Sequence, residues 1–193
     1  IIVLVLAFVS MGVWTYYRWN MREPTITPEA AEIKYMQQMV AQNPKSVFYI
    51  SALAYAFQKN GQIPQAREQY LKAIKLDPKD MGSLYNLGVL AQLEKKFPEA
   101  ESYYKKTLQV SAKHYLANVG LAKVYLDTGK YDLSIQKADS LIKTQRQLVD
   151  PHLIKAIALE KKGKKAEAKI EYQTVLRFIA NQPEALKGLE RLK

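Results

Sequence analysis

Few residues in this 193-residue chain have the chemistry that catalysis near neutral pH requires. His114 and His152 are the only histidines, and neither has a nucleophile motif beside it. Glu99 and Glu101 are two positions apart, so on a helix they do not face each other as an acid and base pair. Since there is no cysteine, thiolate metal sites and haem attachment through Cys-x-x-Cys-His are excluded. We predict that the protein is not an enzyme and binds no metal, cofactor or small-molecule substrate.

The glycines do not gather into a phosphate-binding loop but mark a period of 34 residues. Gly61, Gly129 and Gly163 stand at whole multiples of 34, and Lys95 occupies the vacant slot. The same period relates a column of small residues and a column of aromatic ones: Ala66, Ala100, Ser134 and Ala168, then Tyr70, Tyr104, Ala138 and Tyr172. Such a period is typical of a solenoid built from helical hairpins.

The register predicts four repeat units, at residues 47–80, 81–114, 115–148 and 149–182. Each unit is expected to form a helix, a tight turn and a second helix, with the glycine ending the first helix. Pro64 and Pro98 begin the second helix in the first two units. We expect Asp150 to cap the first helix of the fourth unit and Pro151 to open it.

A single helix is expected on each side of the four units. Residues 20–46 form a linker and a lead-in helix, which runs from 28 to about 42 with Thr27 as its N-cap. Residues 183–193 form a C-terminal capping helix. Its Leu186, Leu189 and Leu192 are expected to cover the last hairpin.

Residues 1–19 have the character of a membrane anchor. No charge precedes Arg18, and aromatic residues gather at the trailing edge of the apolar run, as they do at a lipid headgroup boundary. The predicted membrane-interface residues are Trp14, Tyr16, Tyr17, Arg18 and Trp19. A cleaved signal peptide is the alternative, disfavoured because bulky residues stand where small ones are needed for cleavage. We predict one transmembrane helix that contacts the lipid bilayer.

The sequence gives little indication of the side of the membrane on which the repeats lie. Arg18 and Arg22 alone favour a cytoplasmic domain, but residues 18–45 carry four basic and three acidic residues, a bias of one charge. The absence of cysteine favours an oxidising, extracytoplasmic compartment. We predict a single-pass membrane protein and favour the extracytoplasmic side for the repeats.

The columns resemble the tetratricopeptide repeat, whose first helix carries Leu-Gly or Leu-Ala and whose second carries Ala and a large aromatic residue. Leu53-Ala54, Leu87-Gly88 and Leu121-Ala122 fit the first helix. Two positions depart from the pattern, Ala138 in place of the aromatic residue and Lys155 in place of Leu, so the first helix of the fourth unit is expected to be rotated or shifted. The resemblance implies an all-α fold, a right-handed α-solenoid of about four such units, here preceded by the transmembrane helix.

In this family the first helices line a concave groove that binds other proteins. Transferred by position, the predicted partner-binding groove consists of Phe48, Ser51, Tyr55, Tyr85, Asn86, Val89, Leu116, Val119, Lys123 and Ile157. Aromatic residues there suit a peptide or helix, although Tyr55, Tyr85 and Val89 are equally compatible with packing between hairpins. Of the five positions of the family's carboxylate clamp only Asn86 matches, which disfavours the binding of chaperone tails.

Basic residues dominate the repeats. Residues 46–193 hold 25 Lys and Arg against 15 Asp and Glu. A predicted basic patch surrounds the turn of the fourth unit: Lys161, Lys162, Lys164, Lys165 and Lys169. A solvated face is the simplest interpretation, and an acidic partner or lipid headgroup is favoured over nucleic acid because Arg and interleaved aromatic residues are scarce.

The sequence predicts a membrane-anchored protein–protein interaction scaffold, most consistent with an accessory or structural subunit of a membrane protein complex. The alternative is an assembly or secretion adaptor that transiently binds client segments in its concave groove. A structural subunit implies a large and permanent interface, whereas an adaptor implies weak and salt-sensitive binding.

Overall fold

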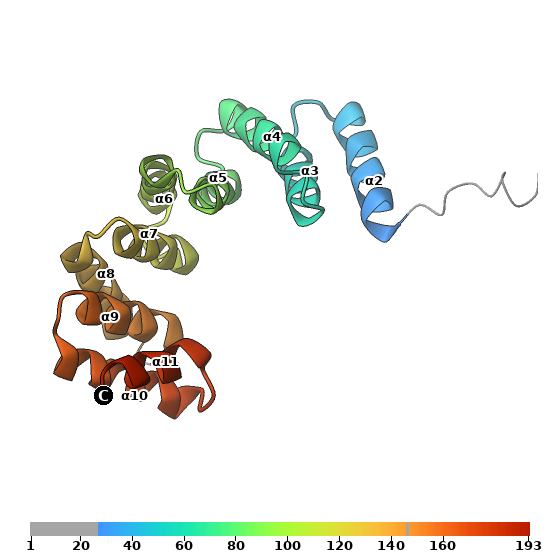
Figure 1. Ribbon diagram of the computed structural model, residues 1–193. Helices are drawn as coiled ribbons and strands as arrows, with labels where there is room; N and C mark the ends of the chain where they lie inside the picture. Colours follow the sequence, from blue (N-terminus) through green and yellow to red (C-terminus); the bar gives the residue numbers. More distant parts are fainter. Residues whose placement is uncertain (1–26, 146) are drawn as a thin grey trace, which may run out of the picture.

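The computed structural model describes residues 27–145 and 147–193, and every regular element within them is a helix (Figure 1). In chain order these are α2 (Pro28–Gln42), α3 (Val47–Lys59), α4 (Ile63–Leu76), α5 (Met81–Leu93), α6 (Phe97–Val110), α7 (Tyr115–Asp127), α8 (Tyr131–Thr144), α9 (Val149–Lys161), α10 (Lys165–Phe178) and α11 (Pro183–Arg191). The all-α expectation is confirmed for this part of the chain.

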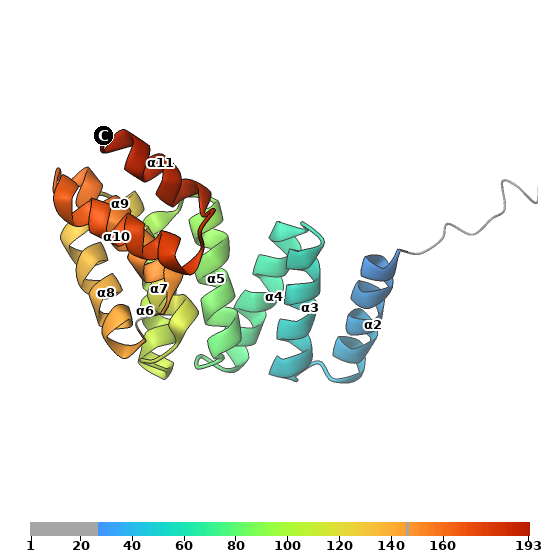
Figure 2. The same cartoon turned by 90° about the horizontal axis from the view of Figure 1, so that it is seen from below.

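The helices form four hairpins arranged along an arc. We number as hairpins 1 to 4 the pairs α3 with α4, α5 with α6, α7 with α8, and α9 with α10. Figure 1 shows α3, α5 and α7 on the inside of the arc and α4, α6 and α8 on the outside, and α9 contacts α7 as the next helix of the inner row. Seen from below in Figure 2, α2 stands beside α3 at one end and α11 lies over α9 and α10 at the other. The inner helices therefore form the concave face.

Side chains at equivalent positions cap three of the inner helices. Ser46, Asp80 and His114 follow one another at 34 residues and are the N-caps of α3, α5 and α7. The Nδ1 atom of His114 accepts the backbone N–H of Ala117 at 3.1 Å, so His114 is a structural cap. The prediction that Asp150 caps α9 was wrong. The N-cap of α9 is the equivalent residue Leu148, because this helix keeps the register of the others.

The turns inside the hairpins need a left-handed backbone. Gly61, Gly129 and Gly163 have φ angles of 73°, 72° and 77°. Lys95, in the vacant glycine slot, adopts the same conformation with φ 58°. Because a Cβ atom makes this region unfavourable by about 1–2 kcal/mol, hairpin 2 carries backbone strain that the other hairpins avoid.

A buried tyrosine joins each of three hairpins to the helix that follows. The Tyr104 ring lies so close to Gly88 of its own hairpin and Gly120 of the next that a Cβ atom on either would approach it to 2.7 or 2.5 Å. Tyr172 fills the equivalent seat against Gly188, at 2.3 Å from such an atom. The close approach explains why glycine stands at these helical positions despite its cost of about 1 kcal/mol.

The hydroxyl of each tyrosine has a fixed partner twelve residues earlier. Tyr70 donates to the Gln58 Oε1 atom at 2.9 Å, Tyr104 to the equivalent Gln92 at 2.8 Å, and Tyr172 to a Glu160 oxygen at 2.6 Å. A buried hydroxyl without a partner costs about 1–3 kcal/mol, so ring and acceptor form one unit.

Hairpin 3 replaces this whole unit with aliphatic packing. Ala138 stands in the tyrosine position, Leu126 in that of the acceptor, and Ile154 in that of the facing glycine. Ile154 is buried in a cluster with Val119, Ala122 and Leu141, with Leu126 packed against it. The large side chain has moved from one helix to its neighbour, which conserves volume and leaves no orphaned hydroxyl.

The ends of the solenoid are closed by α2 and α11. Thr27 caps α2, as expected, by accepting the Ala30 N–H at 3.3 Å. In α11 the buried residues are Ala185 and Gly188, and Leu189 and Leu192 pack against the last hairpin. Leu186 is 42% exposed, contrary to expectation, because its position points away from the tyrosine that Gly188 covers.

The expected membrane anchor lies outside the described residues, as do Trp14, Tyr16, Tyr17, Arg18 and Trp19. From residue 27 onward, leaving out 146, no helix has the length and apolar character of a membrane span.

The strain at Lys95 predicts that Lys95→Gly stabilises the protein. Glycine adopts the left-handed conformation freely, and we expect a gain of about 1 kcal/mol in the free energy of unfolding, measured by urea denaturation. Lys96→Gly is the matched control, since Lys96 has φ −81° and gains nothing from glycine. Equal effects of the two substitutions would contradict this account.

The tyrosine seat predicts that Gly120→Ala lowers the free energy of unfolding by about 1–3 kcal/mol, because the new methyl group overlaps the Tyr104 ring. Gly82→Ala in α5 is the control, where nothing lies within 4 Å and helix propensity favours alanine. Thermal unfolding of both variants checks the pair. A stabilised Gly120→Ala protein would show that the seat is not tightly packed.

Candidate functional site: the concave hollow

A hollow of about 760 Å³ opens on the concave face between α5 and α7. Its walls are aromatic and aliphatic, from Tyr85 and Val89 of α5 and from Leu116 and Val119 of α7. The Tyr104 ring reaches its floor between the two helices, beside Gly120. The tyrosine seat that joins hairpins 2 and 3 therefore also shapes the hollow.

Four charged residues of both signs surround the apolar walls, namely Lys95, Lys123, Asp127 and Asp150. Lys95 is the residue with the strained turn, so its position depends on the backbone of hairpin 2. Asp150 accepts a hydrogen bond from the Tyr115 hydroxyl at 3.4 Å. Within the described residues, Lys95, Lys123 and Asp127 form no ion pair. This rim can receive a ligand that carries both charges beside an apolar group.

The tyrosines in this region are held neutral. Burial raises the pKa of Tyr104, with a smaller contribution from Tyr85, and burial also raises the pKa of Tyr85. The Tyr85 ring lies 6.0 Å from that of Tyr104 and 5.2 Å from His114, between ring centroids. Tyr85 thus both packs on its neighbours and presents one side to the hollow, so the two alternatives stated for it are compatible.

The hollow brings together five of the ten predicted groove residues: Tyr85, Val89, Leu116, Val119 and Lys123. Val119 is only 5% exposed and serves mainly as packing. Sequence reasoning did not select Leu93, Phe97, Lys95, Asp127 and Asp150 as groove residues. The vacant glycine slot at Lys95 was the one available signal, since a charged residue in a left-handed turn is unusual.

The predicted residues of α3 lie beyond the hollow. Phe48 and Tyr55 are 72% and 55% exposed. Ser51 is occupied locally, because its hydroxyl donates to the Val47 carbonyl of the same helix at 2.8 Å. Phe48 and Tyr55 are therefore the prominent apolar side chains that α3 offers at its surface.

Two other predicted residues sit at the hairpin seams. Asn86 occupies the position equivalent to Gly120 and Gly188, which seat the preceding tyrosine, and it is half-buried. Its amide makes no hydrogen bond within the described residues. Ile157 packs against the core cluster of hairpin 4. Neither lines the hollow.

The residues of the predicted basic patch are all exposed. Lys162 pairs with Asp132 of the preceding hairpin, and Lys164 pairs with Glu167 at 3.0 Å. Lys161, Lys165 and Lys169 form no ion pair within residues 27–145 and 147–193. The patch is thus partly neutralised by its own surroundings.

Hairpin 4 has a charged seam in place of the leucine expected at Lys155. The Lys155 ammonium lies 2.8 Å from both Asp139 and Glu171, and the Nδ1 atom of His152 lies 2.6 Å from Glu171. Burial alone would raise the pKa of Glu171, but hydrogen bonds from Lys155 and His152 lower it overall. The helix is not shifted, because the added charges are paired with one another.

Two family models match this chain. Residues 54–93 match the family described as TPR repeat, and residues 92–149 match the one described as Tetratricopeptide repeat. Together the matched segments run from α3 into α9 and include both walls of the hollow.

Among proteins of similar sequence is the Protein O-mannosyl-transferase TMTC3 of Homo sapiens, 33% identical over 106 residues. The alignment covers 53% of this chain and 12% of that protein, so the chain spans a small part of the relative.

Solved structures share the fold. The pilF protein of Pseudomonas aeruginosa superimposes with a TM-score of 0.74 at 21% identity, covering 96% of this chain and 81% of that one. YrrB, described as a TPR protein with an unusual peptide-binding site, gives a TM-score of 0.68 at 15% identity, with 81% and 90% covered.

The lowered pKa of Glu171 predicts a pH-dependent stability. A carboxyl group whose pKa is below 4.5 in the folded state stabilises it above that pH and loses this contribution as the pH falls. Glu171→Gln is expected to lower the free energy of unfolding by about 1–3 kcal/mol at neutral pH. The deficit should shrink as the pH falls below 4.5, which urea titrations at several pH values measure. The exposed Glu190→Gln is the control, and a deficit independent of pH would contradict the role of the carboxylate.

Proposed function

Because this chain is a tetratricopeptide-repeat protein, we propose that it is a protein-binding scaffold that holds a segment of another protein in the hollow between α5 and α7. We further propose that it does so at a membrane, as an accessory subunit of a membrane protein complex. The observation that carries the proposal is the hollow itself, in which apolar walls stand beside unpaired charges of both signs.

The dimensions and chemistry of the hollow support a peptide ligand. Its volume of about 760 Å³ lies within the range of sites that enclose a ligand of several chemical groups. Tyr85 and Leu116 offer contact area to an apolar side chain, and Lys123 and Asp127 stand beside them for polar groups of the same segment. The exposed Phe48 and Tyr55 of α3 stand at the positions equivalent to Leu116 and Val89, so the repeat register predicts a similar apolar surface on α3.

The proposal of membrane attachment rests on the apolar character of residues 1–19, with its aromatic trailing edge. We propose that the repeats lie on the extracytoplasmic side, for which the absence of cysteine is the supporting feature. The transferase activity in the name of TMTC3 belongs to that protein, of which this chain matches 12%.

An adaptor would use the same hollow, but its complex with a client protein would last for a shorter time than the complex of a structural subunit. Charged and partly exposed rim residues favour rapid and salt-sensitive exchange of clients, as an adaptor needs. Gentle detergent extraction followed by mass spectrometry separates the two roles. A fixed stoichiometry with one set of proteins supports a structural subunit, and scattered substoichiometric clients support an adaptor.

We expect Leu116→Ala combined with Lys123→Glu to abolish most co-purification of the partner while leaving the melting temperature within the range of an ordinary surface change. Leu116 is half exposed and Lys123 is exposed, so neither supports the core. The control is Leu133→Ala with Lys137→Glu on the outer helix α8. Undiminished partner recovery with the hollow variant, or equal loss with the control, would refute the assignment of the site.

A further inference from the structure

Two depressions at equivalent positions mark the outer side of the solenoid. One, of about 540 Å³, lies between α4 and α6 and is lined by Ile74, Lys79, Leu84, Lys106, Gln109 and Val110, together with Pro78. The other, of about 310 Å³, is lined by Ile142, His152, Thr174, Arg177 and Phe178. Each residue of the second stands 68 positions, or two repeat lengths, after one in the first.

The recurrence has a geometric cause. The inner helices α5, α7 and α9 contact one another along the concave face. The outer helices α4 and α6 are joined near their starts by the ion pair of Arg67 with Glu99 at 2.9 Å, and α5 packs between them. Figure 1 shows them diverging on the outside of the arc. The start of α5 supplies the floor of the first depression through Leu84. The depression thus follows from the curvature of the fold, but the residues that line it are particular to this chain.

The lysines of the first depression differ from those at the opposite edge. Where α4 and α8 begin, Lys59 pairs with Glu32 at 3.1 Å and Lys130 pairs with Glu101 at 2.8 Å, although Lys95 at the same edge has no ion pair in the part of the chain that the structure describes. Within the described residues, Lys79 and Lys106 have no such partner.

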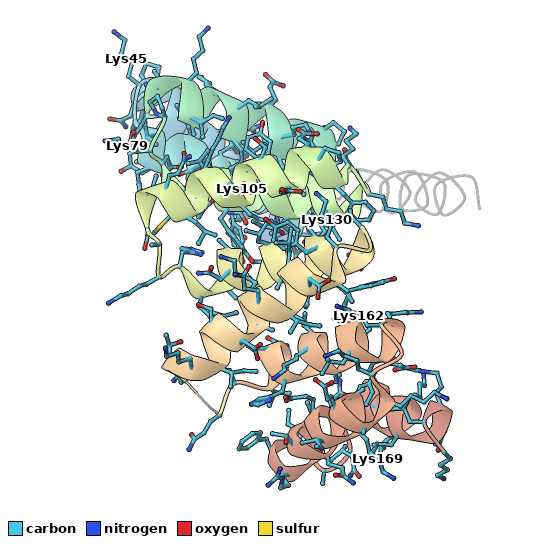
Figure 3. The ribbon with its side chains drawn as sticks, turned by 90° about the vertical axis from the view of Figure 1, so that its left-hand side faces the viewer. Lys45, Lys79, Lys105, Lys130, Lys162 and Lys169 are labelled. Atoms are coloured by element: carbon cyan, nitrogen blue, oxygen red, sulfur yellow. The ribbon has the colours of Figure 1, made fainter. Side chains whose placement is uncertain are left out.

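Figure 3 shows the separation of the two edges, with Lys45 and Lys79 on one side and Lys130 and Lys162 on the other. Lys45, Lys79 and Lys113 follow one another at 34 residues in the loops between hairpins, and all three are exposed. The loop edge therefore carries a row of lysines that form no ion pair within the described residues.

Two carboxylates, Asp77 and Asp80, stand in the same loop and keep their charge, but neither forms an ion pair with Lys79 or Lys106. Asp77 accepts the Lys79 backbone N–H at 2.9 Å, and Asp80 accepts that of Ser83 at 3.0 Å as the cap of α5. The Lys106 ammonium lies 5.4 Å from the centre of the Tyr103 ring, which holds it over the outer face. Two available cations thus stand above an aliphatic floor of Ile74, Leu84 and Val110.

We propose that the depression between α4 and α6 is a second binding site, which takes an acidic segment of a partner protein whose aliphatic side chain rests between Lys79 and Lys106. This site is separate from the concave hollow, because the two have no lining residue in common. The carboxylates of the bound segment neutralise Lys79 and Lys106, and its aliphatic side chain covers the floor of the depression.

The lining favours a protein segment over nucleic acid or lipid. Single-stranded nucleic acid is bound by aromatic side chains on which bases stack, and this floor is aliphatic. Lys45 follows the C-terminal end of α2, so the loop edge is opposite the edge at which α2 begins.

The test uses the whole chain and an array of short synthetic peptides in which the number of Asp and Glu residues and the number of Leu residues vary independently. We expect the chain to retain only those peptides that contain both acidic residues and Leu. Lys79→Glu with Lys106→Glu should weaken that retention about tenfold or more. The control Lys34→Glu with Lys187→Glu makes the same change in net charge at exposed residues without ion pairs among the described residues. It should change retention less than about twofold.

The remaining outcomes overturn the proposal. Retention that follows acidic content alone, or that both double variants weaken equally, would indicate unspecific charge attraction. Absence of any saturable retention below about 1 mM would show that no such site exists. Binding of anionic vesicles or RNA through Lys79 and Lys106, in place of peptides, would assign the surface to another class of partner. Loss of retention in the Leu116 and Lys123 variant alone would place the peptides in the concave hollow.

Discussion

The packing of one ring between two helices fixes how hairpin 2 meets hairpin 3, and the candidate site depends on that contact. Tyr104 occupies space that only glycine at positions 88 and 120 leaves free, and its hydroxyl is satisfied by Gln92. The ring therefore fixes both the spacing within hairpin 2 and the approach of hairpin 3. The same contact recurs at Tyr172 with Gly188, whereas Ile154 fills the equivalent space between hairpins 3 and 4. The hollow lies on the concave side of the solenoid, and the depressions lie on its outer side.

Hairpin 3 shows which part of the constraint is essential. Ala138, Leu126 and Ile154 change together, so the space is filled and no polar group is left unpaired. Hairpin 4 solves a similar problem with charge, since Lys155 in a leucine position is compensated by Asp139 and Glu171. The architecture thus requires matched partners across each seam and tolerates several chemistries for them.

The sequence predicted the fold well because its signals are local and periodic. Glycine in the turns and the 34-residue columns anticipated the starts of α3, α5, α7 and α9, and the left-handed backbone of Lys95 occupies the slot that the pattern left vacant. Asp150 was misassigned because a local capping motif competed with the register, and the register prevailed. The hollow was predicted only in part, since its depth depends on how far neighbouring hairpins separate. The outer depressions depend on the splay of helices that are distant in sequence, and no single segment encodes it.

The central claim is that this scaffold holds a partner protein against the concave face between α5 and α7. The most direct measurement is amine-reactive cross-linking of the complex extracted under gentle conditions, with the linked lysines identified by mass spectrometry. The account predicts cross-links to one partner through Lys95 and Lys123, which stand on the rim of the hollow. A partner linked only through lysines of the outer helices, such as Lys105 and Lys169, and never through Lys95 or Lys123, would contradict it.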